Sequence, residues 1–290
     1  MTYQSRASTS TAIMLSAKKS GTPLGWLALP FTTGWRHREL IRVIVQREFA
    51  QRFRGSALGW IWAIISPIVM LGAYTIVFTG PFKVSSAADA GVGHYALFIF
   101  AALIPFNLFT ELFARAPNLM RENAWFLKKT IFPSDTLGWI ALCRALIYAG
   151  ISFTILLVFE LLLTGTIPAT ALLVPLVIVP YCLFLLGVVW FFAALGSLTQ
   201  DVAHIVTSIM PLMIFGSPVF YSIADVPPTM RSFAYFNPLA IYIEMTRNLA
   251  LIGNSPDFAL YVQAWVVALV VFWVGHAVFM RYRSILVDVV

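Results

Sequence analysis

The sequence predicts an all-α integral membrane protein with six transmembrane helices, an N-terminal amphipathic interface helix and short re-entrant helices before the last span. Composition supports this fold class, because 60% of the 290 residues are hydrophobic and 11% are charged, whereas roughly a quarter are charged in soluble domains. Several runs free of Asp, Glu, Lys and Arg reach the about 20 residues that a helix needs to cross a bilayer. The net charge of +7 is explained by cations gathered on one membrane face, so no nucleic-acid partner is expected.

The first predicted element is an interface helix over residues 36–54. Apolar residues at helical spacing predict a face that lies in the lipid boundary, and they are Ile41, Ile44, Val45 and Phe49. The other surface is basic and is expected to face anionic headgroups of the membrane lipids. The arginines of this segment are Arg36, Arg38, Arg42, Arg47, Arg52 and Arg54. Residues 1–33 are mixed in composition and predict a mobile cytoplasmic tail.

Six transmembrane segments follow from the uncharged runs. They are predicted at about residues 57–80, 94–113, 136–163, 169–198, 202–221 and 258–280. Arg144 and Glu160 fall near the two ends of the third segment, where long side chains can snorkel to the interface. Residues 34–285 therefore predict one transmembrane domain, and residues 286–290 are its cytoplasmic end.

The distribution of cations orients these segments. With six spans and the N-terminus inside, 16 of the 19 Lys and Arg residues lie in cytoplasmic segments. Those left outside are Lys83, Arg231 and Arg247. Because cytoplasmic segments carry the excess of Lys and Arg, both termini are predicted to be cytoplasmic.

Two loops are longer than a turn requires. The cytoplasmic loop 114–135 predicts a helix from about Leu119 to Lys129, and its apolar and basic character favours a docking element over a solvated connector. The outer loop 222–256 is apolar and is interrupted by prolines. It is expected to fold back onto the membrane as short re-entrant helices, because irregular backbone at that depth must be covered by protein or must line a water-filled path.

The sequence contains no recognisable site for catalysis, nucleotide or metal. No glycine is followed by lysine, so the GxxxxGK[ST] phosphate loop is absent. The four histidines are scattered, and Glu111 and Glu160 near span ends are better explained by pairing or snorkelling than by a proton relay. Cys143 and Cys182 lie in apolar runs and are expected to be packing residues. The chain is therefore expected to be a non-enzymatic subunit that holds no cofactor or metal itself.

Five segments, in order along the chain, resemble the permease subunit of polysaccharide ABC exporters. They are RELIRVIVQREFAQRFRGSALGWIWAIISPIVMLGAYTIVF, FIFAALIPFNLFTELF, ENAWFLKKTIFPSDTL, SPVFYSIADVP and AYFNPLAIYIEMTR. The similarity covers about residues 34–285 and indicates the ABC-2 type transporters of O-antigen, capsule and teichoic acid. Within that family, RGSALGWIW and LIPFNLF are most similar to O-antigen permeases.

The resemblance implies a transport subunit of the bacterial inner membrane. Two permease copies and two P-loop ATPase subunits would form the exporter, with ATP and Mg bound on the ATPase. The implied substrate is an undecaprenyl-diphosphate-linked glycan. The coupling helix that docks on the ATPase would comprise Arg121, Glu122, Asn123, Trp125, Phe126, Leu127, Lys128 and Lys129.

The resemblance also suggests where the substrate passes. Arg47, Arg52 and Arg54 would lie where the lipid diphosphate approaches, since the planar guanidinium binds phosphate oxygens bidentately. Aromatic rings along the channel would let sugar rings slide past without tight hydrogen bonding. The candidates are Trp60, Trp62, Tyr74, Phe78, Phe215, Phe220 and Tyr221. For each of them, an interfacial belt or a lipid-facing position is the alternative.

Two other functions fit parts of the sequence. An ABC-2 exporter of a small lipid or a drug would have the same architecture, although the long outer loop and the basic interface helix favour a polymer. A membrane-embedded acyl- or glycosyltransferase is the alternative from another class, and the absence of clustered Asp, Glu or His disfavours it.

Overall fold

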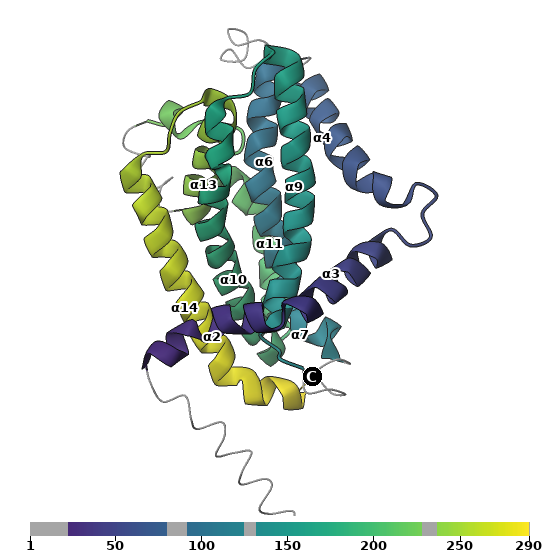
Figure 1. Ribbon diagram of the computed structural model, residues 1–290, viewed down its shortest axis with the longest axis vertical. Helices are drawn as coiled ribbons and strands as arrows, with labels where there is room; N and C mark the ends of the chain where they lie inside the picture. Colours follow the sequence, from purple (N-terminus) through teal and green to yellow (C-terminus); the bar gives the residue numbers. More distant parts are fainter. Residues whose placement is uncertain (1–22, 80–91, 125–131, 228–236, 290) are drawn as a thin grey trace, which may run out of the picture.

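The computed structural model describes residues 23–79, 92–124, 132–227 and 237–289, and every regular element in these ranges is a helix (Figure 1). Two helices, α2 (Pro23–Arg36) and α3 (Arg38–Arg52), lie across one end of the molecule. We call this the α3 end. The opposite end, near which α13 (Pro238–Arg247) lies, is the α13 end.

Long helices connect the two ends. They are α4 (Trp62–Thr79), which follows the short turn η1 (Gly59–Ile61), α6 (Val92–Arg115), α9 (Thr136–Thr164), α10 (Val174–Leu198), which follows η3 (Ala169–Leu173), and α14 (Phe258–Val289). The shorter elements are η2 (Ala116–Asn118), α7 (Leu119–Glu122), α11 (Asp201–Gly216), η4 (Ile223–Asp225) and one turn of π-helix, η5 (Asn248–Ile252).

Five helical segments of the described chain are long and apolar enough to cross a membrane, judged by length and composition. The helix in the place of the fifth predicted span, α11, is apolar but has 16 residues. At 1.5 Å per residue it is about 24 Å long, less than the roughly 30 Å of a bilayer core. It ends early because Ser217 is extended and is followed by Pro218, which cannot continue the hydrogen-bonded helix. The count of six spans stays a prediction.

Helix α2 occupies part of the predicted N-terminal tail. Residues 23–36 are helical, and the ring of Phe31 lies 5.0 Å from that of Phe272 on α14. Only His37 separates α2 from α3. The sequence did not predict this helix, because the packing surface that stabilises it is supplied by α14, far along the chain. Residues 1–22 lie outside the described part.

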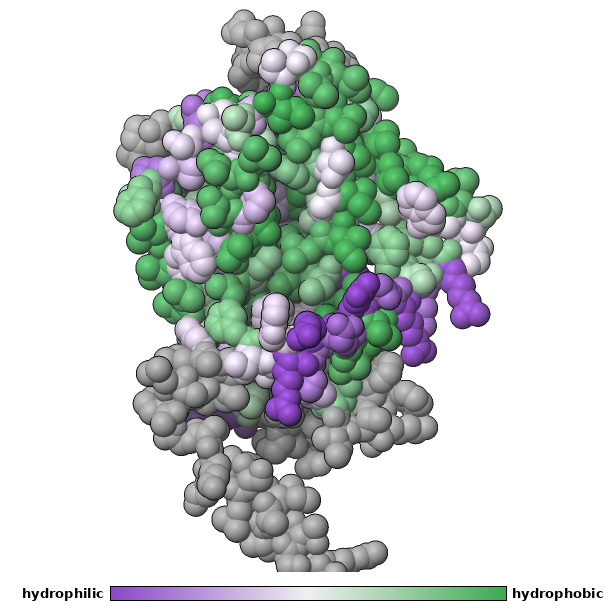
Figure 2. Space-filling model, in the orientation of Figure 1, coloured by the Kyte–Doolittle hydropathy of each residue, from purple (hydrophilic) through white to green (hydrophobic). Residues whose placement is uncertain are grey.

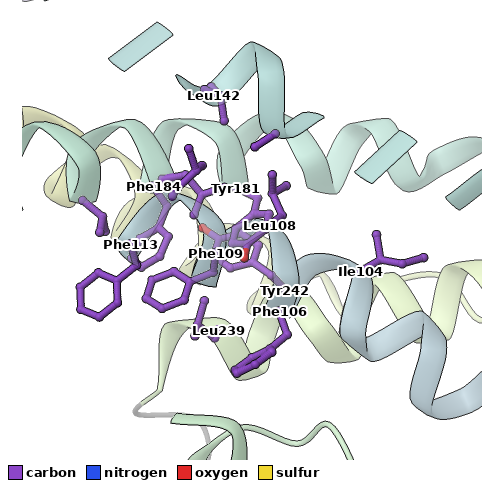
Figure 3. Packing of buried hydrophobic residues seen from close by; sticks show 14 of the residues in the cluster. Ile104, Phe106, Leu108, Phe109, Phe113, Leu142, Tyr181, Phe184, Leu239 and Tyr242 are labelled. Carbon is purple, nitrogen blue, oxygen red and sulfur yellow. The ribbon is translucent and has the colours of Figure 1, made fainter. Parts of the chain in front are cut away.

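Helix α6 is the centre of the bundle. Helices α4, α9, α11 and α13 all pack against it, and most of its side chains are buried. Figure 3 shows rings from α6, α10 and α13 gathered in this core, among them Phe109, Tyr181 and Tyr242. The Tyr181 hydroxyl donates a hydrogen bond of 2.6 Å to the Pro105 carbonyl, which satisfies the polar atom of a buried ring. The buried core therefore extends along the interior faces of the long helices.

Helices α10 and α14 form the tightest pair. A Cβ on Gly187 would overlap the Val271 carbonyl group, and a Cβ on Gly275 would overlap the carbonyl group of Gly187. The two backbones therefore touch, as in membrane helix pairs that meet through small residues. Glycine is required at both positions by this close approach.

The outer surface of the spans is apolar. Exposed residues include Val69 and Ile76 on α4, Leu162 on α9 and Val270 on α14. Figure 2 shows this hydrophobic surface over the long helices and a hydrophilic band along α3. A surface of this kind is suited to lipid or to another apolar protein face.

Candidate functional site

At the α3 end, charged side chains from four helices meet in one cluster. We call it the charge network, and it comprises Glu48 and Arg52 of α3, Glu111 and Arg115 of α6, Glu122 of α7 and Arg144 of α9. Arg144 donates to a Glu48 oxygen at 3.1 Å and to a Glu111 oxygen at 3.2 Å. Its side chain is mostly buried, so these pairs replace the snorkelling that the sequence predicted for it.

Arg115 connects three elements of the charge network. Its Nη1 donates to Glu48 at 3.1 Å and its Nε donates to Glu122 at 2.6 Å. Glu48 lies on the interface helix, whereas Glu122 lies in the loop that follows α6. A displacement of that loop would therefore pull on Arg115 and, through Arg115, on Glu48 of α3.

A cavity of about 330 Å³ lies beside the charge network, between α3, α4, α6 and α9. Arg52 and Glu111, whose charged atoms are 3.6 Å apart, line it together with Asn107. The Arg52 guanidinium also lies 4.5 Å from the ring centroid of Tyr148. Trp62 and other apolar side chains form the remaining wall. The cavity can accept a group with a polar head and an apolar body.

At the α13 end, the fully buried Arg247 organises the chain around α13. It donates to the backbone carbonyls of Pro218 at 2.7 Å, Val219 at 3.1 Å and Tyr221 at 3.2 Å. Glu244, one turn earlier on α13, accepts a further bond at 3.2 Å. Since Arg has five N–H donors in a fixed fork, one side chain satisfies several groups of an irregular segment.

The charge of Arg247 persists at neutral pH. Burial lowers the pKa of its guanidinium to about 10, and the nearby Glu244 carboxylate opposes that shift. The guanidinium also lies 3.6 Å from the ring centroid of Phe98 on α6. This cation–π contact and the ion pair compensate for the loss of water around a buried charge.

A second cavity, of about 600 Å³, opens beside Arg247. Its wall includes His94, Glu160 and Asp225, and also the aromatic residues Phe220 and Tyr221. The mixture of aromatic rings and hydrogen-bonding groups suits a ligand whose ring has apolar faces and polar substituents.

Comparison with known proteins places these features in a family. Residues 39–251 match the ABC-2 type transporter family. The chain belongs to this family. It is similar to the O-antigen export system permease protein RfbA of Myxococcus xanthus, 23% identical over 86% of this chain and 95% of the relative. RfbA of Klebsiella pneumoniae is 23% identical over 74% and 82%, and the polysialic acid transport protein KpsM of Escherichia coli is 24% identical over 73% and 81%.

In this ABC-2 chain, the first part of the predicted coupling helix is visible. Arg121 donates to the Gly196 carbonyl of α10 at 2.8 Å, Glu122 belongs to the charge network, and the buried Asn123 donates to the Leu119 carbonyl. The helix begins at Leu119, as predicted, and α7 ends at Glu122. The remaining predicted residues, Trp125, Phe126, Leu127, Lys128 and Lys129, lie outside the described part.

The three arginines predicted to meet a lipid diphosphate are not gathered at one point. Arg52 turns toward α6 and lines the smaller cavity, whereas Arg47 and Arg54 are exposed to solvent or lipid. All three lie at the α3 end. A ligand that touched all of them would have to extend along α3.

The predicted channel aromatics of this ABC-2 chain occupy two regions. Trp60, Trp62 and Phe215 are exposed, at 62%, 42% and 74% of their surfaces, and Tyr74 is half-buried. Phe220 and Tyr221 line the cavity at the α13 end. The side chain of Phe78 lies outside the described part. Among the candidates whose side chains are described, Phe220 and Tyr221 line one cavity together.

The structure adds residues that the sequence did not single out. The sequence marks Arg247 only as a cation outside the membrane, and it does not mark Glu48. The sequence signal for Arg247 is an arginine near the end of an apolar loop. No sequence signal points to Glu48, because its partners lie on α6 and α9. No group of three or more His, Cys, Asp or Glu able to hold a metal occurs in the part of the chain that the structure describes.

Proposed function

We propose that this ABC-2 chain is the permease subunit of an ATP-driven exporter that moves a lipid-linked polysaccharide of the O-antigen type across the bacterial inner membrane. The observation that carries the proposal is the similarity to O-antigen export permeases over nearly the full length of both chains. The absence of a phosphate loop from the sequence agrees with ATP hydrolysis, and its ATP and Mg, on a separate subunit.

The proposed topology has six spans, with the α3 end and both termini in the cytoplasm. Helix α11, together with the chain that follows it, would form the fifth span, and α13 with η5 would form a re-entrant unit on the periplasmic side. Two observations support this arrangement. Cations gather in the segments assigned to the cytoplasm, and Arg247 satisfies the irregular backbone that a re-entrant segment exposes.

The proposed coupling route starts at the loop after α6. A partner ATPase would dock on residues 114–135, and Arg115 would pass its displacement from Glu122 to Glu48 on the interface helix. Such a route needs connections that can change partners, and the shared carboxylates of the charge network supply them.

The proposed channel requires a second copy of the chain. Trp60, Trp62 and Phe215 are large aromatic residues exposed on one chain, so the matching face of a second copy would enclose them. The glycan would then pass along these rings, while Arg47, Arg52 and Arg54 meet the diphosphate on the cytoplasmic side. Polar hydroxyls of the sugar can keep their hydrogen bonds to water in such a channel.

The direct test is the surface glycan of a strain that lacks this chain. We expect loss of long-chain O-antigen, recovered by the intact chain, and copurification of a P-loop ATPase with it. An unchanged glycan profile would overturn the polymer assignment and favour export of a small lipid or a drug. Turnover of a lipid-linked substrate by the purified chain without an ATPase would instead favour the enzyme alternative.

Capsule export is the second candidate, and the similarity to KpsM favours it. The two candidates differ in where the glycan is attached after export. Extraction of lipopolysaccharide and of capsule from the same deletion strain distinguishes them, because only one fraction should lose its polymer. A teichoic acid exporter would require a cell wall that carries that polymer.

A further inference from the structure

A third cavity, of about 750 Å³, has no part in the proposed transport route. It lies at the α3 end, where α2, α3 and α9 meet. Phe31 of α2, Ile41 of α3 and Ile147 of α9 are among the apolar side chains of its wall. It shares no lining residue with the smaller cavity beside the charge network.

Two arginines border this cavity. Arg38 and Arg42 are four residues apart on α3, so their side chains lie on the same face of the helix. Arg38 lies 5.3 Å from the ring centroid of Trp35, and its only ion-pair partner in the described ranges is the exposed Glu39, at 4.0 Å. Arg42 is exposed, and no carboxylate of the described residues pairs with it. The rim of the cavity therefore carries positive charge, and Glu39 is its one carboxylate partner among the described residues.

The wall of the cavity contains one buried donor. The indole Nε1 of Trp139 is buried and has no hydrogen-bond partner among the described residues. Helix α2 comes close to this ring because Gly34 has no Cβ, which would lie 2.8 Å from Trp139 Cε2. Because protein atoms cover this donor, Trp139 contributes only the apolar surface of its ring to the wall of the cavity.

We propose that this cavity binds an anionic phospholipid, with an acyl chain between α2, α3 and α9 and the phosphate between Arg38 and Arg42. The part of the cavity between the apolar side chains of α2, α3 and α9 is a poor site for water. The lining of the cavity comes from α2, α3 and α9, and α3 crosses the end of the spans (Figure 1), so an acyl chain would enter it at that level of the membrane. Positive pockets beside membrane helices select acidic headgroups over neutral ones.

This inference goes beyond the proposed function. It requires that α3 lies at a membrane surface, but it is independent of which molecule is transported. Its failure and that of the transport proposal are therefore distinguishable, because lipid retention and surface glycan are separate measurements.

The experiment measures which phospholipid the full-length purified chain retains. The chain is reconstituted with equal amounts of phosphatidylglycerol and phosphatidylcholine, and the retained lipid is counted by native mass spectrometry. The site variant is Arg38→Gln/Arg42→Gln. The matched control is Arg36→Gln/Arg281→Gln, which removes two exposed cations of the α3 end that do not line the cavity.

We expect the site variant to reduce the preference for phosphatidylglycerol about tenfold, equal to about 1.4 kcal/mol, and the control to leave it near the native value. An equal loss in both variants would mean that cations attract acidic lipid without a site and would overturn the proposal. An unchanged preference in the site variant would overturn it as well.

A second measurement keeps the proposal testable if the charge variant folds poorly. Ile147→Trp fills the apolar part while both arginines remain, and it should reduce retained phosphatidylglycerol. Cys143, which lines the cavity, should react more slowly with a small maleimide in phosphatidylglycerol vesicles than in phosphatidylcholine vesicles. Equally slow reaction in both vesicles would show that protein, such as a second copy of the chain, fills the cavity, and would overturn the lipid assignment.

Discussion

The two ends of the bundle use buried arginines in different ways. At the α13 end, Arg247 gives most of its donors to backbone carbonyls, with Glu244 as its one carboxylate partner. At the α3 end, Arg115 and Arg144 give theirs to carboxylates on separate helices. A backbone carbonyl cannot move away without unfolding its segment, whereas a side-chain pair can exchange partners. We infer that the first arrangement fixes a shape and the second transmits displacement.

The difference follows from the local backbone. Residues 217–221 are not helical, so their carbonyls lack partners within a helix and need donors from elsewhere in an apolar environment. At the α3 end, the residues of the charge network lie on helices, whose backbone groups are already hydrogen-bonded. Charged side chains are then free to connect one helix to another.

Replacement of the buried arginine should have the largest effect on stability. Arg247→Met removes the donor to four backbone carbonyls and the ion-pair partner of Glu244, and we expect a loss of about 3–5 kcal/mol in the free energy of unfolding. Thermal unfolding of the purified protein in detergent measures it, with exposed Arg281→Met as control. Arg247→Lys should lose less, because it keeps the charge but not the planar fork. If Arg247→Met melted at the same temperature as the native protein, Arg247 would not be fixing the shape of the chain around α13.

Loss of the central arginine of the charge network should cost less. Arg144→Met leaves Glu48 and Glu111 with fewer partners, but both keep some exposure and Arg115 still reaches Glu48. We expect a loss of about 1–3 kcal/mol, reduced by this exposure. Without Arg144 the charge network holds three carboxylates and two arginines, so adding Glu111→Gln restores the balance of charge and should recover part of the loss. A double variant less stable than Arg144→Met alone would show that the Arg52–Glu111 pair contributes more than the excess negative charge costs.

Removal of the connecting arginine should affect transport more than folding. Arg115→Gln is expected to lower stability by only about 1 kcal/mol. The polymer exported per ATP hydrolysed by the reconstituted complex should fall at least about fivefold, within the usual range of coupling energies. The control is Glu39→Gln, an exposed position of α3 outside the charge network. If export and hydrolysis fell together, Arg115 would be structural.

The smallest expected effect is the dependence of the stability loss on salt, which should differ between the two ends. The Arg52–Glu111 pair is half-exposed, so Arg52→Gln should lower stability by at most about 1 kcal/mol at low salt. In 1 M salt the screening length falls to about 3 Å, and the difference from the native protein should vanish. The deficit of Arg247→Lys should persist at both salt concentrations. A deficit of Arg52→Gln that survived high salt would mean that its contact with Tyr148, not the ion pair, matters.

The helices could be predicted from the sequence wherever hydropathy alone determines where they begin and end. The apolar segment predicted at 136–163 is observed as α9, and the predicted interface helix contains α3. The prediction overran at α11, because hydropathy continues to Tyr221 while Ser217 and Pro218 end the helix. Hydropathy does not report where backbone hydrogen bonding stops.

The site was harder to predict, because its residues are brought together by packing. The partners of Arg144 lie on α3 and α6, and no local pattern identifies them. Arg247 has its ion-pair partner three residues away, which a sequence can suggest. The carbonyls that it binds are known only once the chain after α11 is placed.

The glycine contact between α10 and α14 has a mechanical consequence. Two backbones that touch at Gly187 and Gly275 cannot slide past each other freely, so these helices move as one body. Helix α2 contacts that body through Phe31 and Phe272 and contacts α9 through Gly34 and Trp139, whereas α3 is held by α6 and α9 through Glu48. His37 is the single residue between α2 and α3, and its N–H donates to the Thr33 carbonyl while its carbonyl accepts from the Ile41 N–H, so a displacement of α3 would be passed on to α2 and from there to α14.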